Sequence, residues 1–232
     1  MNFDWNSNTI EWYQAANEYS GFFKNIANLI APKLEGYSTF CDIGCGLGLI
    51  DLELSKSINN ITCIDINENA IEALKKSIVD KNISNIKPCL MDCQDIKENW
   101  DVIYTSFFGG LELENFIPHC KKLISVVNKR NLAELYPDKY RRFQKRTTEE
   151  VAQELTQKGI TYSFREASFE FGQPLLSRQD ARDFVKTQAP GITTEDLEAF
   201  LSLHLRETGE LKYPFLIPRT KSMGIFEIEG EL

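Results

Sequence analysis

Three alternating glycines follow a short apolar segment near the front of the chain, and a carboxylate stands two positions before the first glycine. The run is Phe40-Cys41-Asp42-Ile43-Gly44-Cys45-Gly46-Leu47-Gly48. Glycines let the backbone turn sharply after a strand and let a ligand approach the N–H groups that open the next helix. The dinucleotide fingerprint G-x-G-x-x-G does not fit, because the third glycine arrives one residue early, before Leu49. The pattern predicts a nucleotide-like cofactor, and a tight turn without a ligand is the alternative.

Further polar residues end the apolar segments that follow. Asp65 comes after residues 61–64, Asp92 after residues 86–91, and Ser106 after residues 100–104. In an open doubly wound sheet, ligands bind beyond the carboxyl ends of the strands, and a ribose-binding acid is expected about 20 residues after the glycines. Asp65 lies in that neighbourhood. These residues are therefore predicted to share one rim of a parallel sheet with the glycine turn.

The D-x-G-x-G-x-G run, together with Asp65, resembles motif I of the class I S-adenosylmethionine (SAM)-dependent methyltransferases. The resemblance covers roughly residues 36–130. It implies a Rossmann-like α/β fold, a doubly wound and mostly parallel seven-stranded sheet whose last strand is antiparallel. It also implies SAM as cofactor and S-adenosylhomocysteine as product.

The resemblance implies a role for each matching position. Asp42 would order the glycine loop and face the sulfonium, and Asp65 would accept the ribose hydroxyls. Ile66 would pack on the adenine, and Asp92 would receive the adenine amino group. Each has a plainer alternative, since Asp42 could cap a turn, Ile66 could be core, and Asp92 could cap a helix. The predicted cofactor-binding residues are Asp42, Gly44, Cys45, Gly46, Gly48, Asp65, Ile66, Asp92, Cys93 and Ser106.

Composition indicates a globular enzyme rather than a nucleic-acid or membrane protein. The 232 residues are 42% hydrophobic and 26% charged, with a formal net charge of -8, which disfavours broad binding to a phosphate backbone. No leader pattern opens the chain and no continuous apolar stretch approaches the length of a membrane span, so a cytoplasmic location is expected. The six cysteines lack metal-site spacing and are predicted to be reduced core thiols without a metal. Cys45 or Cys93, near a helix start, could be acidified.

The chain is expected to form one methyltransferase domain over residues 1–232. Residues 1–35 would form an N-terminal helical cap, residues 36–130 the cofactor-binding half, and residues 131–232 the acceptor-side half. Two long strands are predicted at residues 162–171 and 213–228. A helical insertion at about residues 177–207 lies between them and is well placed to cover the acceptor.

Aromatic and basic residues supply the candidates for acceptor binding. Tyr13 and Tyr19 of the N-terminal helical stretch, and Phe107 and Phe108 after the fourth strand, are predicted to line the acceptor site, with helix packing as the alternative for the tyrosines. A basic run could bind an anionic acceptor, or could be a solvated helix face. It comprises Lys139, Arg141, Arg142, Lys145 and Arg146.

No side chain identifies itself as a catalytic base. His204 lies on an apolar stripe and is expected to be a core residue, while His119 is expected at the surface. A base is needed only when the acceptor must lose a proton, so the catalytic residues stay unknown.

The predicted function is methyl transfer from SAM to a small molecule by in-line displacement. Enzymes that methylate nucleobase amino groups typically carry an Asn- or Asp-Pro-Pro-aromatic turn after the fourth strand, whereas this chain has Thr105-Ser106-Phe107-Phe108. A nucleic-acid acceptor is therefore not expected. A non-catalytic SAM-binding scaffold and an NAD(P)-dependent oxidoreductase stay open as alternatives. The methylated atom and the oligomeric state also stay open.

Overall fold

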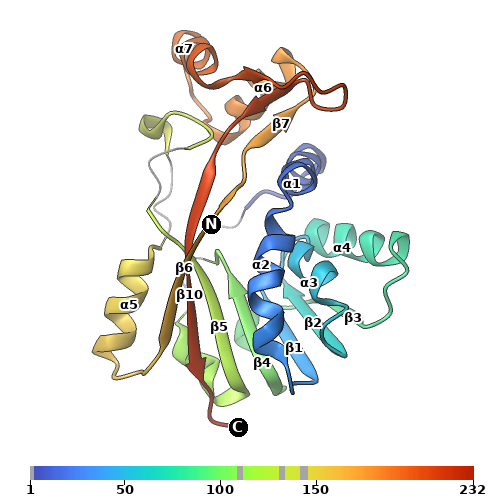
Figure 1. Ribbon diagram of the computed structural model, residues 1–232, viewed down its shortest axis with the longest axis vertical. Helices are drawn as coiled ribbons and strands as arrows, with labels where there is room; N and C mark the ends of the chain where they lie inside the picture. The colour runs from blue at the N-terminus through green and yellow to red at the C-terminus, as the bar shows by residue number, and fades with distance from the viewer. Residues whose placement is uncertain (1–2, 109–111, 131–133, 142–145) are drawn as a thin grey trace.

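The computed structural model describes residues 3–108, 112–130, 134–141 and 146–232. Helices and strands alternate through the first half, and a long antiparallel pair of strands dominates the second (Figure 1). The helices are α1 (Ser7–Ser20), α2 (Phe22–Ile30), α3 (Leu49–Leu54), α4 (Glu68–Asp80), α5 (Thr148–Gln157), α6 (Arg178–Gln188) and α7 (Thr194–His204). The strands are β1 (Thr39–Ile43), β2 (Asn60–Asp65), β3 (Ile86–Leu90), β4 (Trp100–Ser106), β5 (Cys120–Asn128), β6 (Ser163–Glu170), β7 (Gln173–Leu175), β8 (Arg206–Glu207), β9 (Phe215–Ile217) and β10 (Thr220–Glu229).

The main sheet has seven strands in the order β3-β2-β1-β4-β5-β10-β6. β1 pairs in parallel with β2 on one side and with β4 on the other. β10 alone is antiparallel, and it pairs with both β5 and β6. The strand order reverses beside β1, which places the glycine turn at the position where doubly wound folds bind ligands. The predicted fold class is confirmed.

Local sequence signals explain the helices that flank this rim. The Asn67 side chain caps α4 by accepting the Ala70 N–H, and Ala70, Ile71 and Leu74 form its buried face. α5 opens with a reciprocal capping box between Thr147 and Glu150, an arrangement that satisfies two otherwise unpaired backbone donors.

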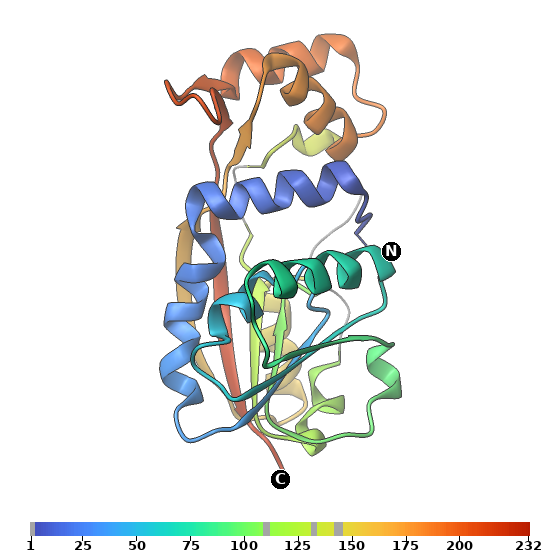
Figure 2. The ribbon, with the colours of Figure 1, turned by 90° about the vertical axis from the view of Figure 1, so that its right-hand side faces the viewer.

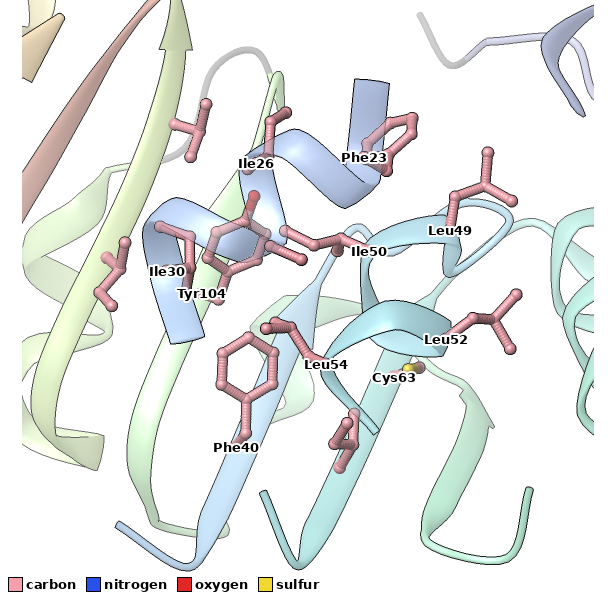
Figure 3. Close-up of a cluster of buried hydrophobic side chains, with 14 of the residues drawn as sticks. Phe23, Ile26, Ile30, Phe40, Leu49, Ile50, Leu52, Leu54, Cys63 and Tyr104 are labelled. Carbon is pink, nitrogen blue, oxygen red and sulfur yellow. The ribbon is translucent and has the colours of Figure 1, made fainter. Parts of the chain in front are cut away.

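The largest core cluster lies between the sheet and helices α2 and α3 (Figure 3). Phe40 of β1 stacks on Tyr104 of β4 with ring centroids 5.6 Å apart, and both side chains are fully buried. Ile26 and Ile30 of α2 and Leu54 of α3 close over them (Figure 3). Burying each side chain of this size stabilises the fold by roughly 1.5–3 kcal/mol, so the sheet beneath the glycine turn is firmly packed.

The predicted N-terminal helical stretch is two helices rather than one. Gly21 adopts a left-handed conformation, with φ of 63°, at the break between α1 and α2. The break lets α2 pack on the sheet while α1 runs between the sheet and the inserted helices (Figure 2).

The inserted region forms a small unit with its own core. β7 and β8 flank β9 in a three-stranded sheet, and α6 and α7 pack on it through a separate apolar cluster that includes Trp12 of α1 and Leu135. The predicted final strand is divided, because Pro218 and Arg219 separate β9 from β10. Among the described residues no helix is long and apolar enough to cross a membrane.

Candidate cofactor and acceptor site

The glycine turn is held directly against the end of β2. The N–H groups of Gly44 and Cys45 both donate to the Ile64 carbonyl, at 2.8 and 3.1 Å. Gly44 and Gly46 have φ values of 73° and 53°, a conformation that side chains with a Cβ rarely adopt. A Cβ on Gly44 would overlap the Phe108 ring, and a Cβ on Gly46 would touch the Trp5 ring. The two positions therefore need glycine for both conformation and space.

Asp65 joins β2 to the same turn. One oxygen, Oδ2, accepts the Gly46 N–H at 2.8 Å, and the other, Oδ1, accepts the Asn67 N–H at 2.8 Å. A carboxylate has about four acceptor sites, so two remain on the half-buried Asp65 side chain. Two free acceptor sites suit a ligand that presents two adjacent hydroxyls.

The aromatic rings of Trp5 and Phe108 cover the turn. The sequence did not predict that Trp5 would lie there. Trp5 lies over Gly46, and its carbonyl accepts a hydrogen bond from the Asn69 side chain at 2.8 Å. The Trp5 ring meets the Tyr13 ring edge-on at 5.2 Å. Trp5 precedes α1 and reaches the turn only through tertiary folding.

Asp42 is buried beside a second carboxyl group, Asp51 of α3. The oxygens of both groups lack a hydrogen-bond partner among the described residues. The expectation that Asp42 could cap a turn is therefore wrong. Burial first, and then the Asp51 charge, raise the pKa of Asp42 well above its ordinary value, and burial raises the pKa of Asp51 to about 6. Two buried neighbouring carboxyl groups cannot both ionise without a large cost, so the pair favours the state in which one of the two holds a proton.

The residues predicted to hold an adenine lie at the rim. Ile66 is 47% exposed, so the alternative that it belongs to the core is wrong. Asp92 caps a short 3-10 helix, Cys93–Asp95, by accepting the Gln94 N–H at 2.9 Å. Ser106, at the end of β4, is half-buried.

A cavity of about 490 Å³ lies beside Cys93. Its lining residues are Cys93, Gln94, Ile96, Glu112, Asn115, Phe116 and His119.

The six cysteines are free thiols, of which Cys41, Cys63 and Cys120 are buried. The expectation that Cys93 is acidified is wrong, because burial and the neighbouring Asp92 carboxylate raise the pKa of its thiol. The pKa of Cys45 is raised as well. Among the described residues no group of three or more His, Cys, Asp or Glu side chains is gathered for a metal ion.

The tyrosines predicted to bind the acceptor are not brought together. Tyr13 contacts Trp5 and meets Phe171 edge-on at 5.4 Å, so it lies beside the glycine turn. Tyr19 packs on Tyr213 at 6.1 Å, beyond β8. The neighbouring Trp12 serves helix packing, because its indole N–H donates to Asp180 of α6 at 2.8 Å.

Both histidines lie away from the glycine turn. His204 is exposed and stacks on Phe200 at 4.5 Å, so the expectation of a core histidine is wrong. The half-buried His119 pairs with the Asn99 side chain.

The described members of the predicted basic run all face carboxylates. Lys139 pairs with Asp196 at 2.7 Å, Arg141 pairs with Glu134 at 2.9 Å, and Arg146 pairs with Glu154. Arg142 and Lys145 lie outside the described residues. The Lys139 side chain is 62% exposed, as a solvated face requires, whereas Arg141 and Arg146 are largely covered. All three cations are ion-paired, so these side chains do not form an open cationic surface.

Two buried cations were instead missed by the sequence analysis. The Arg219 Nε–H donates to the Phe171 carbonyl at 3.0 Å, and its guanidinium lies 5.4 Å from the centre of the Phe171 ring. Lys221 is 7% exposed, and its Nζ lies 3.2 Å from the centre of the Phe107 ring. Phe107 directly follows β4 and has a φ of 54°, which is unusual for an aromatic residue.

Comparison with known proteins relates part of the chain to a family. A family model described as a methyltransferase domain matches residues 40–129. A probable cobalt-precorrin-6B C(15)-methyltransferase of Methanococcus vannielii is 28% identical over 91 residues, which are 39% of this chain and 47% of that protein. The chain thus matches about half the length of this curated relative.

Solved structures share the fold at low identity. A SAM-dependent methyltransferase from Aquifex aeolicus has a TM-score of 0.54 at 14% identity and covers 98% of this chain and 100% of its own. A putative RNA methyltransferase from Pyrococcus horikoshii has a TM-score of 0.51 at 12% identity, with 91% and 84% coverage. Residues 40–129 thus match a methyltransferase domain, and the solved structures show that the chain has the fold of such enzymes. SAM is the cofactor that this match implies.

The residues of the turn fit this cofactor. The glycines leave no Cβ between the backbone and a ligand that replaces the Trp5 and Phe108 rings, and Asp65 retains two acceptor sites for a ribose.

Proposed function

We propose that this protein transfers the methyl group of SAM to a small-molecule acceptor. The observation that carries the proposal is the bond from the Gly46 N–H to Asp65, which joins the glycine turn to a half-buried carboxylate with acceptor capacity left over. When bound, SAM supplies an electrophilic methyl group on a sulfonium. An acceptor that is already nucleophilic needs only alignment and the exclusion of water.

Asp65 would hold the ribose, and the glycine turn would hold the amino-acid end of the cofactor. Ile66 would pack on the adenine, because its side chain is exposed at the rim next to Asp65. Asp92 would accept the adenine amino group, since the bond from the Gln94 N–H leaves its carboxylate with further acceptor sites.

The acceptor would lie above the ends of β4 and β5, on the side that α1 and the insertion cover (Figure 2). Tyr13, Phe107 and Phe171 gather there. The insertion of residues 177–207 would act as the acceptor cover. Its separate core, anchored on Trp12, would let it shift relative to the sheet.

The acceptor class is part of the proposal. A small molecule is supported by the partial match to a protein named for cobalt-precorrin methylation. The acidic composition and the ion-paired state of the described basic run disfavour a phosphate backbone. The fold itself does not discriminate, because a putative RNA methyltransferase shares it.

A methyl-transfer screen from labelled SAM tests this function. The arms are a metabolite panel, total RNA, duplex DNA and unfolded protein, each with a matched Asp65→Ala sample. Label in a metabolite that disappears in Asp65→Ala supports the proposal. Label in RNA or DNA alone would overturn the acceptor class, and SAM binding without transfer in any arm would indicate a non-catalytic scaffold.

A further inference from the structure

The Trp5 side chain lies across the half of the glycine turn that Asp65 holds. One ring atom would stand 3.0 Å from a Cβ added to Gly46, so the indole packs directly on the Gly46 backbone. The Trp5 carbonyl accepts the Asn69 side-chain N–H at 2.8 Å, in the first turn of α4. Trp5 is thus anchored both on the glycine turn and on the helix that follows β2.

Asp65 joins the same two segments that Trp5 bridges. Its carboxylate accepts the Gly46 N–H on the glycine turn and the Asn67 N–H just before α4. A ligand that bonds to Asp65 and approaches the Gly46 backbone therefore needs the space that the indole fills. The other end of the turn, at Gly44, lies under the Phe108 ring instead.

Residues 3–6 are attached to the protein mainly by surface contacts. Phe3 is exposed and packs on the Trp5 ring, with ring centroids 4.4 Å apart. Asp4 is exposed as well, and its carbonyl accepts the Thr9 hydroxyl at 2.6 Å. The Trp5 side chain itself is half-buried and meets Tyr13 edge-on. Segments with few buried contacts open most easily, so this segment can move without unfolding the rest of the chain.

α1, in contrast, is fixed by bonds to the small inserted unit. The Trp12 indole N–H donates to Asp180 at 2.8 Å, and the Gln173 side chain donates to the Trp12 carbonyl at 3.0 Å. Asn6, which caps the helix, has extended backbone dihedrals, with φ of -98° and ψ of 174°. Asn6 is therefore the point at which residues 3–6 can turn while α1 stays in place.

We propose that residues 3–6 form a gate over the cofactor site, in which the Trp5 ring covers Gly46 and swings away about Asn6 when SAM or S-adenosylhomocysteine binds. This inference rests on the proposed methyltransferase function and adds a regulatory element to the same site. The apparent dissociation constant of a ligand that binds only the open state is the intrinsic constant divided by the open fraction. The gate therefore lowers cofactor affinity, and any change that weakens the gate raises it.

Removal of the indole distinguishes a gate from a cofactor contact. Trp5→Ala should tighten the binding of SAM and S-adenosylhomocysteine about threefold or more, because a larger fraction of the chain is open. An indole that contacts the bound cofactor would have the opposite effect, since its removal would weaken binding. Phe164→Ala removes an exposed ring from β6, at the far edge of the sheet, and should leave both affinities unchanged. Calorimetry measures the affinities.

The bond from Asn69 to the Trp5 carbonyl provides a second test in which the indole is kept. Asn69→Ala should raise the association rate of SAM about twofold or more, because a hydrogen bond that holds the gate shut is lost. Glu72→Gln is the matched control, because Glu72 is exposed on the same helix and pairs with Lys75 at 2.7 Å. Stopped-flow fluorescence of the indoles measures the rate in the unmodified chain and in both variants.

The two proposals fail in different ways. Absence of SAM and S-adenosylhomocysteine binding by both the unmodified chain and Trp5→Ala would reject the methyltransferase function. Binding by both chains, with affinity in Trp5→Ala equal to or weaker than in the unmodified chain, would overturn the gate alone. Asn69 is exposed, so Asn69→Ala decides the matter if Trp5→Ala fails to fold. An association rate in Asn69→Ala equal to that of the unmodified chain would then overturn the gate.

Discussion

The Asp65 carboxylate accepts the Gly46 N–H at 2.8 Å, so the end of β2 and the middle of the glycine turn form one unit. The same carboxylate also accepts the Asn67 N–H at 2.8 Å, at the start of α4. Loss of this side chain therefore affects both the shape of the turn and the proposed ribose contact.

Asp65→Ala should weaken SAM binding by about 1–3 kcal/mol, because charged acceptors of buried hydrogen bonds contribute on that scale. Gly46→Val should abolish binding, since the added side chain meets the Trp5 ring and strains a positive φ. Calorimetry on both variants measures this, with Glu68→Gln on the exposed side of α4 as the control. Unchanged SAM affinity in both would show that the site is assigned wrongly.

Trp5 should report cofactor binding by fluorescence. Its ring lies over Gly46, so a ligand on the turn must change the solvent exposure of the indole. Addition of S-adenosylhomocysteine should alter the emission of the chain, and Trp5→Phe should remove most of that change. Trp12→Phe is the matched control, because Trp12 packs on Phe184 of α6. An undiminished signal in Trp5→Phe would argue against the proposed ligand position.

Asp51 should make the fold more stable in mild acid than at neutral pH. Its folded pKa of about 6 exceeds the ordinary value of 3.8, so the folded protein keeps a proton that the unfolded chain releases. The contribution is complete below about pH 3.8 and is lost as the pH rises through 6. Asp51→Asn should remove this pH dependence and raise stability at pH 7 by on the order of 1–3 kcal/mol.

Urea denaturation between pH 4 and pH 8 measures the effect as the difference between Asp51→Asn and the unmodified chain. This difference isolates the contribution of Asp51, because other titratable groups change the free energy of unfolding with pH in the opposite direction. Asp101, for example, has a pKa lowered to about 2, first by its bond with Lys121, and so stabilises the fold above its ordinary pKa. A difference that does not vary with pH would mean that Asp51 ionises normally.

Removal of the insertion should separate cofactor binding from methyl transfer. Leu175 of β7 and Phe215 of β9 are direct register partners, so an Asn-Gly turn can join them in place of residues 176–214. Trp12→Gln should accompany the deletion, because the loss of α6 would otherwise leave the Trp12 indole exposed to water. The shortened chain should keep SAM binding and lose transfer to the native acceptor. Retained transfer would refute the role of the insertion as a cover.

Local chemistry explains which parts of this structure the sequence could predict. The spacing of Asp42, Gly44 and Gly46 is a short-range signal, and it located the turn correctly. Gly21 and Pro218 are breaks whose effect depends on what each flanking segment packs against. The sequence therefore predicted one helical stretch and one strand where the fold has two of each.

The acceptor side was less predictable, because its residues meet only through tertiary contacts. Trp5 reaches Gly46 across the start of α4, and Lys221 reaches Phe107 from the last strand. A lone lysine in a strand of mixed polarity carries no sign of burial. The basic run after Leu135 looked more promising in the sequence, yet its described members are paired with Glu134, Asp196 and Glu154.

Titration of the unmodified chain with SAM, S-adenosylhomocysteine and NAD tests the central claim most directly. A turn with its third glycine one residue early, next to a carboxylate with two free acceptor sites, should bind SAM and S-adenosylhomocysteine at one molecule per chain and should not bind NAD. Saturable binding of NAD, or no heat with either SAM or S-adenosylhomocysteine, would contradict the account.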